Sequence, residues 1–144
     1  MAESALHTLA CGVRERDSTA IAEALTLVED TRPERLSSVR SLVDSLERGT
    51  PPPHTVVGLT GPPGVGKSTL AGALIRHWNR DGTGVGMIAV DPSSRRSGGA
   101  LLGDRARVRH EPGAPVFVRS LAARDQLGGL APAARAAVVL LRAA

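Results

Sequence analysis

Lysine and cysteine are almost missing from this chain of 144 residues. Of its 18 Lys and Arg residues only Lys67 is lysine, and every other basic position is arginine. The single cysteine, Cys11, excludes an internal disulfide framework and indicates a reducing compartment. The N-terminal residues have no basic region followed by a long apolar run, so neither a signal peptide nor a membrane span is expected. These absences favour a cytoplasmic protein without a membrane role.

Aromatic residues are also scarce, with one Trp, one Phe and no Tyr, so Ala, Val and Leu must fill the core. The basic stretch 105–110 has no aromatic residues interleaved to stack bases, and a nucleic-acid partner is therefore not expected. The four histidines show no paired spacing, which argues against a His/Cys metal cluster. A formal net charge of +4 supports acidic partners only weakly.

The first third of the chain predicts a helical arm over residues 1–50. Residues 18–30 place apolar side chains on one helical face, and Ser18 is a candidate N-cap. Thr31 and Glu34 have capping-box spacing at the start of a second helix that runs to Gly49. Its predicted buried stripe is Leu36, Val39, Val43 and Leu46. The proline-rich stretch "TPPPH" then predicts a hinge.

Strands and helices alternate over residues 51–144, which form the second predicted domain. The predicted strands are 55–60, 84–90 and 114–120, and the predicted helices are 67–82 and 131–144. The first of these helices is expected to turn Leu70, Leu74 and Trp78 inward and to stop at Gly82. The alternation favours a mostly parallel sheet in a three-layer α/β fold.

A glycine-rich loop lies between the strand 55–60 and the helix 67–82. The stretch "GPPGVGKS" from Gly61 to Ser68 matches G-x-x-x-x-G-K-[ST], the phosphate-binding P-loop. Glycines keep side chains away so that backbone N–H groups converge on phosphates, and the helix directs its positive dipole end at them. The pattern therefore predicts a P-loop NTPase fold. The alternative is a glycine-rich turn that binds no ligand.

The single lysine falls at the one position where arginine cannot replace it. Lys67 supplies a compact point charge between the terminal phosphates, a slot that does not suit a planar guanidinium. Ser68 offers a hydroxyl oxygen to Mg²⁺.

Two acids follow the second strand of this half. Asp91 ends the strand at the edge of an α/β sheet where ligands bind, and Asp104 follows a Gly-Gly pair. Carboxylates beside a triphosphate orient Mg²⁺-bound or attacking water. The competing interpretations are a turn residue before proline for Asp91 and a solvated loop acid for Asp104. Arg95 and Arg96 are either solvated or one of them neutralises transition-state charge.

Three stretches together carry a more specific signal than the loop alone. "GPPGVGKSTL", "AVDPSSRRSGGALLGDRARV" and "VFVRSLAARDQLGGLA" resemble the MeaB/ArgK family, P-loop GTPases of the SIMIBI class that act as chaperones for adenosylcobalamin-dependent methylmalonyl-CoA mutase. "ALTLVEDTRPE" resembles the helical arm of that family.

The resemblance implies roles for individual residues. The nucleotide would be GTP. Mg²⁺ would be bound by Ser68, Asp91 and Asp104, and the two acids would also be catalytic residues. Residues 93–108 would form the first switch. The phosphates would be wrapped by Gly61, Pro62, Pro63, Gly64, Val65, Gly66, Lys67, Ser68 and Thr69. The partner would be a cobalamin-dependent mutase, and the complete protein would be a homodimer.

Several parts of that family pattern do not occur in residues 1–144. They are the second switch, the Asn-Lys-x-Asp-like stretch that reads guanine, and the C-terminal dimerisation arm. We therefore expect a C-terminally incomplete fragment of a longer protein, inactive as a GTPase by itself; the alternative is a short natural product. Two other functions stay open, a P-loop kinase or ATPase for a small molecule and a non-catalytic remnant that binds a partner.

Overall fold

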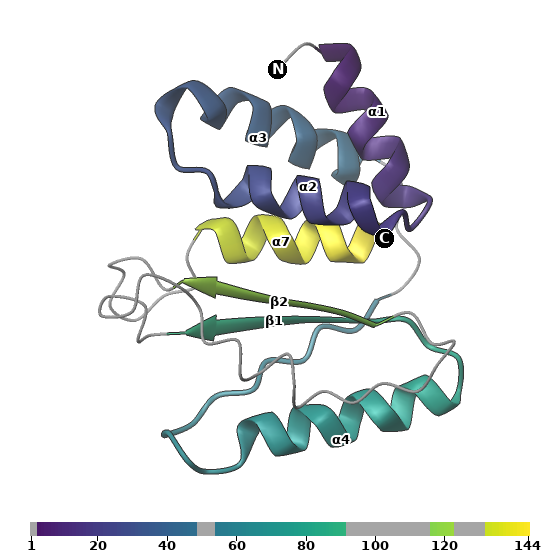
Figure 1. The fold of residues 1–144 in the computed structure, drawn as a ribbon, viewed down its shortest axis with the longest axis vertical. Coiled ribbons are helices and arrows are strands. Elements are labelled where there is room, and N and C mark those ends of the chain that lie inside the picture. Colours follow the sequence, from purple (N-terminus) through teal and green to yellow (C-terminus); the bar gives the residue numbers. More distant parts are fainter. Residues whose placement is uncertain (1–2, 49–53, 92–115, 123–131) are drawn as a thin grey trace. The chain divides into compact units, whose positions relative to one another are not determined.

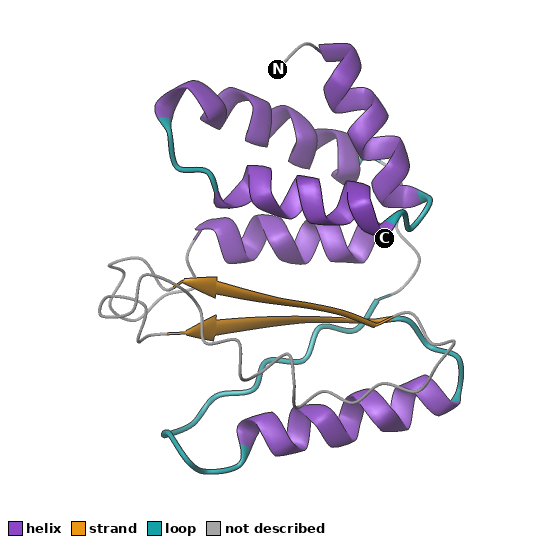
Figure 2. Ribbon diagram, viewed as in Figure 1, coloured by secondary structure: helices purple, strands orange, loops and turns teal. Residues whose placement is uncertain are grey.

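The computed structural model describes residues 3–48, 54–91, 116–122 and 132–144, and the chain divides into two compact units (Figure 1). The helical unit, residues 1–54 with 126–144, contains α1 (Glu3–Arg14), α2 (Ser18–Glu29), α3 (Pro33–Glu47) and α7 (Pro132–Ala143). The strand unit, residues 55–125, contains α4 (Lys67–Arg80), β1 (Val85–Asp91) and β2 (Val116–Ala122), as Figure 2 shows by secondary structure. The predicted domain boundaries, 1–50 and 51–144, stay a prediction. None of the described helices is long and apolar enough to cross a bilayer.

Helix α1 is the one described helix for which the sequence analysis gave no range. Its buried residues are Leu6, Leu9, Ala10 and Val13, which follow the spacing of one helical face. The helix packs against α2, and Gly12 allows the close approach: a Cβ atom at that position would lie 2.7 Å from the Cβ of Ala20. The turn between the two helices holds Arg16 at a φ of 62°, in the left-handed region.

The predicted N-caps of α2 and α3 were both wrong. Helix α2 begins at Ser18, but its N-cap is Asp17, whose carboxylate accepts a hydrogen bond of 2.7 Å from the Ala20 N–H. Helix α3 has Arg32 and not Thr31 as its N-cap, and the Arg32 side chain makes no capping hydrogen bond. The Arg32 backbone N–H donates a hydrogen bond of 3.1 Å to Oδ1 of the preceding acid, Asp30.

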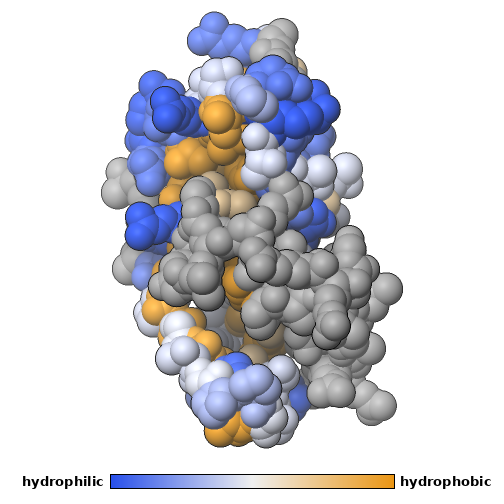
Figure 3. Space-filling view, turned by 90° about the vertical axis from the view of Figure 1, so that its left-hand side faces the viewer, coloured by the Kyte–Doolittle hydropathy of each residue, from blue (hydrophilic) through white to orange (hydrophobic). Residues whose placement is uncertain are grey.

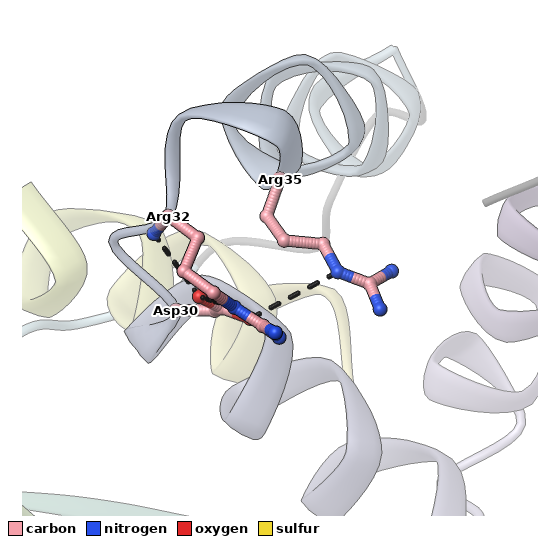
Figure 4. Close-up of polar contacts among 3 residues, drawn as sticks. All are labelled: Asp30, Arg32 and Arg35. Atoms are coloured by element: carbon pink, nitrogen blue, oxygen red, sulfur yellow. Dashed lines mark hydrogen bonds and ion pairs between the residues drawn. The ribbon is translucent and has the colours of Figure 1, made fainter.

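Asp30 also binds the guanidinium of Arg32, at 2.9 Å and 3.0 Å from Nε, and lies 3.9 Å from Nε of Arg35 (Figure 4). The Arg32 side-chain hydrogen bond is the main reason that the pKa of Asp30 falls from 3.8 to about 2. These contacts join the end of α2 to the start of α3.

The buried face of α3 differs from the predicted stripe. Ser38, Leu42 and Leu46 are buried, whereas Leu36 is 50% exposed. Of the four predicted residues only Leu46 is buried, because α1 and α7 pack against the neighbouring face of this helix. Val39 and Val43 are half-buried and lie beside this buried face.

Helix α7 completes the core of the helical unit, and its predicted range of 131–144 is confirmed to within a residue. It packs against α1, α2 and α3 and buries Ala134, Ala137 and Leu140. Nε of Arg16 donates a hydrogen bond of 2.7 Å to the carbonyl of Ala144, just beyond the end of α7, where a cation is favourable. In Figure 3 the hydrophobic side chains of this unit form a strip flanked by hydrophilic ones.

The strand unit confirms the parallel pairing and the α/β class. Strands β1 and β2 are parallel neighbours, with Val85 opposite Val116 and Asp91 opposite Ala122, within two residues of their predicted ranges. Helix α4 ends before Gly82, whose φ of +72° and N–H bond to the Asn79 carbonyl fit the predicted stop.

Two predictions for the strand unit were wrong. Residues 55–60 form no strand, and Val56, Val57 and Leu59 are 60%, 49% and 40% exposed. No described strand pairs with them, and an apolar run without a neighbour has no ladder to join. The residues of α4 that are buried are Gly72 and Ile75, whereas Leu70 is 51% exposed and Leu74 and Trp78 are half-buried.

Candidate nucleotide-binding loop

The three glycines of the predicted phosphate loop all have positive φ. The values are +146° for Gly61, +80° for Gly64 and +95° for Gly66, which L-residues with a Cβ atom rarely adopt. Each therefore has a conformational reason to be glycine, independent of any motif. The loop residues 61–66 are exposed, so that a ligand has access to them.

The loop leads directly into the N-terminus of α4. Gly66 is the N-cap in left-handed conformation, and within the described part of the chain no side chain caps this helix. The amides of the first turn have no intrahelical acceptors, and the helix dipole places positive charge at the same end. This arrangement suits an anion that accepts several hydrogen bonds.

Lys67, half-buried, is the first residue of α4, and its side chain folds back over the loop. Its Nζ donates hydrogen bonds of 2.8 Å to the carbonyl of Gly61 and of 2.8 Å to the carbonyl of Pro62. The ammonium group is thus held by the same loop that would wrap a phosphate. The sequence motif located this lysine but gave no sign of its two carbonyl partners.

Ser68 and Thr69 follow in the first turn of α4, and both are exposed. The Ser68 hydroxyl is the kind of hard oxygen ligand that Mg²⁺ uses together with water and phosphate oxygens. No group of three or more His, Cys, Asp or Glu side chains suited to a metal occurs among the residues that the structure describes. The roles of Ser68, Asp91 and Asp104 toward a magnesium ion therefore stay predictions.

The structure describes only part of the predicted catalytic set. Asp91 is the last residue of β1, at the carboxyl end of the parallel strands, where the sequence placed it. Asp104, the arginine pair Arg95 and Arg96, and the predicted switch 93–108 lie outside the described residues. The structure thus brings together the residues predicted to bind phosphate, and their roles, like those of Asp91 and Asp104, stay predictions.

The glycine conformations, the uncapped helix and the enclosed lysine define a P-loop protein of the α/β class. The family model "Methylmalonyl Co-A mutase-associated GTPase MeaB" matches residues 21–144. The chain belongs to this MeaB family of GTPases, as the resemblance predicted.

Individual proteins support the assignment. A protein of Pyrococcus horikoshii whose name assigns it to the GTPases is 45% identical over 132 residues, covering 91% of this chain and 40% of its own length. The fused isobutyryl-CoA mutase of Geobacillus kaustophilus is 34% identical over 137 residues, 89% of this chain and 12% of that protein. The crystal structure of a LAO/AO transport system kinase gives a TM-score of 0.70 at 27% identity, covering 99% of this chain and 41% of that chain. The chain thus spans about 40% of the length of the first relatives that it matches.

Proposed function

We propose that the protein at its natural length binds and hydrolyses Mg²⁺·GTP with residues 61–69 around the phosphates. The observation that carries this proposal is the position of Lys67 Nζ, held 2.8 Å from two loop carbonyls at the uncapped end of α4. A triphosphate in the loop would meet backbone N–H groups, a helix dipole and this ammonium group together. The preference for guanine is supported by the family and by the names of relatives.

The proposed hydrolysis is an in-line attack by water on the terminal phosphate. In this reaction the protein contributes mainly position and charge stabilisation. Lys67 would neutralise charge on the phosphate oxygens, and Ser68 would hold Mg²⁺. Asp91 and Asp104 are proposed to orient water and the metal ion, in line with their place in the sequence.

The proposed partner is an adenosylcobalamin-dependent mutase in the cytoplasm, which the protein would assist in a GTP-dependent way. Two findings support a mutase: the description of the matching family, and a relative in which a similar region is part of one chain with isobutyryl-CoA mutase. We further propose that the protein acts as a homodimer at its natural length.

One observation favours a second candidate, a P-loop kinase for a small molecule. The similar solved structure is titled as a transport system kinase. A kinase would transfer the phosphoryl group to a bound acceptor instead of water, with the same phosphate loop. The two candidates therefore differ in product and not in the part of the site described above.

Nucleotide titration of the natural-length protein tests the proposal. In calorimetry we expect a clearly higher affinity for Mg²⁺·GTP than for Mg²⁺·ATP. We also expect phosphate to be released from GTP without an added acceptor. Equal affinity for ATP, or phosphate release only with an acceptor, would favour the kinase. Residues 1–144 alone are expected to show no GTP turnover, and turnover by this chain would contradict that expectation.

A further inference from the structure

Two adjacent prolines, Pro62 and Pro63, belong to the loop whose carbonyl groups bind the lysine. A lysine side chain usually samples many rotamers, and fixing it has an entropic cost. Here the Nζ of Lys67 meets the carbonyls of Gly61 and Pro62, both at 2.8 Å. Each acceptor belongs to a peptide bond whose nitrogen is a proline nitrogen, that of Pro62 or that of Pro63. The prolines are therefore part of the two groups that hold the lysine.

For two consecutive carbonyls to point at one ammonium group, the backbone between them must be fixed. A proline ring locks its own φ and restricts the conformation of the residue before it. Pro62 thus restricts Gly61, and Pro63 restricts Pro62. The conformation of Gly61 favours glycine, because its φ is +146° and a Cβ there would lie 3.3 Å from Cγ1 of Val65. The two prolines therefore limit the backbone torsions that direct both carbonyls at the lysine.

We propose that Pro62 and Pro63 are positioning residues that hold the Lys67 ammonium group in place before a nucleotide arrives. The inference rests on the proposed function, since its purpose is phosphate binding. The entropy of the lysine side chain is then lost when the protein folds and not when the nucleotide binds. The affinity for the nucleotide is higher as a result. The prolines themselves donate nothing to the phosphates, because they have no N–H group.

The first test measures the lysine without any nucleotide. The double variant Pro62→Ala/Pro63→Ala is compared with wild type and with Pro33→Ala, a control at the first residue of α3 in the other unit. The rate of Lys67 acylation is followed by peptide mass spectrometry in the natural-length protein, after Arg-specific cleavage that releases residues 49–76. We expect the double variant to react roughly tenfold faster, equivalent to about 1.4 kcal/mol, and the control to match wild type. Equal rates in the double variant and wild type would overturn the proposal.

Thermal unfolding of each variant checks that the fold persists. If the double variant unfolds early, the single variants Pro62→Ala and Pro63→Ala replace it, since each removes one of the two ring restrictions. Faster acylation of Lys67 in either single variant then supports the proposal, and unchanged rates in both contradict it.

The second test measures affinity for Mg²⁺·GDP. When Lys67 is retained, we expect the double proline variant to bind Mg²⁺·GDP about tenfold more weakly than wild type. In a protein that also carries Lys67→Ala, the same two proline changes should have no effect on the affinity. An equal loss in both backgrounds would show that the prolines do not act through the lysine. If the wild-type protein binds no nucleotide at all, the proposed function fails, while the acylation rates still decide whether the prolines hold the lysine.

Discussion

The helical unit and the strand unit are held together in different ways. Among the described residues, all but two of the buried apolar side chains lie in the helical unit, and the exceptions are Ile75 and Leu121. The strand unit instead leaves Val56, Val57 and Leu70 about half exposed or more. The strand unit thus contains a loop defined by its backbone conformation, whereas the helical unit contains most of the packed apolar core.

The difference follows from the number of elements in each unit. Four helices bury an apolar face of each against the others. In the strand unit the described elements are two paired strands and one helix, and they bury fewer apolar side chains. Relatives of greater length have room for further strands, in line with the share of their length that this chain spans.

The largest expected effect concerns the packed core. Leu42 is fully buried in α3, so Leu42→Ala should lower the free energy of unfolding by about 2–5 kcal/mol. Leu70→Ala in α4 removes a side chain that is 51% exposed and should change the free energy of unfolding by about 0.5 kcal/mol or less. Chemical unfolding followed by circular dichroism measures both. Equal losses would break the contrast between the two units.

A change in the loop should affect ligand binding and leave folding unchanged. Lys67→Ala removes the ammonium group held by two carbonyls and should weaken Mg²⁺·GTP binding on the order of a hundredfold, with an unchanged melting temperature. Lys67→Arg should also impair binding, since a planar guanidinium does not fit a slot for a point charge. Arg76→Ala, an exposed basic residue of the same helix, is the control for calorimetry. Full affinity in Lys67→Arg would refute the slot argument.

The close approach of α1 and α2 gives a smaller effect. In Gly12→Ala the new Cβ would lie 2.7 Å from the Cβ of Ala20, and the overpacking should cost about 1–3 kcal/mol of stability. Gly58→Ala in the strand unit meets no atom within 4 Å and should be close to neutral. Urea unfolding compares the free energies of unfolding of the two variants. An unchanged value for Gly12→Ala would mean that α1 and α2 move apart without cost.

The smallest effect is a pH dependence at the junction of α2 and α3. The Arg32 guanidinium lowers the pKa of Asp30 to about 2 in the folded chain, below its usual value of 3.8. The folded state therefore favours the ionised carboxylate, and its contribution is present above about pH 4 and lost as the pH falls towards 2. Asp30→Asn should show a smaller drop in melting temperature than wild type between about pH 5 and pH 2.5. Identical drops would assign the acid sensitivity to other groups.

Elements with a strong local pattern could be predicted, and those decided by their neighbours could not. The loop from Gly61 to Ser68 and the helices α2, α4 and α7 follow from turn chemistry and apolar spacing. The run at 55–60 has the composition of a strand, but composition alone provides no partner for its backbone. In the same way, the face of α3 that is buried depends on where α1 and α7 lie.

The caps and the lysine contacts show a second limit. Asp17 and Ser18 both have side chains that can cap the start of α2, and it is the Asp17 carboxylate that accepts the Ala20 N–H. The carbonyl partners of Lys67 depend on loop torsions that a motif does not specify. The predictions for Asp104 and for residues 93–108 concern positions that the structure does not describe.

The place of α7 in the helical unit has a consequence for the order of synthesis. Helices α1, α2 and α3 leave the ribosome first, but the helix that covers part of their apolar surface follows only after residues 48–131. At about 5–20 residues per second, translation of those roughly 80 residues takes between about 4 and 16 seconds. During that interval α2 and α3 lack one of the helices that they pack against. Nascent chains therefore present an apolar helical surface to chaperones before the first of the two units is complete.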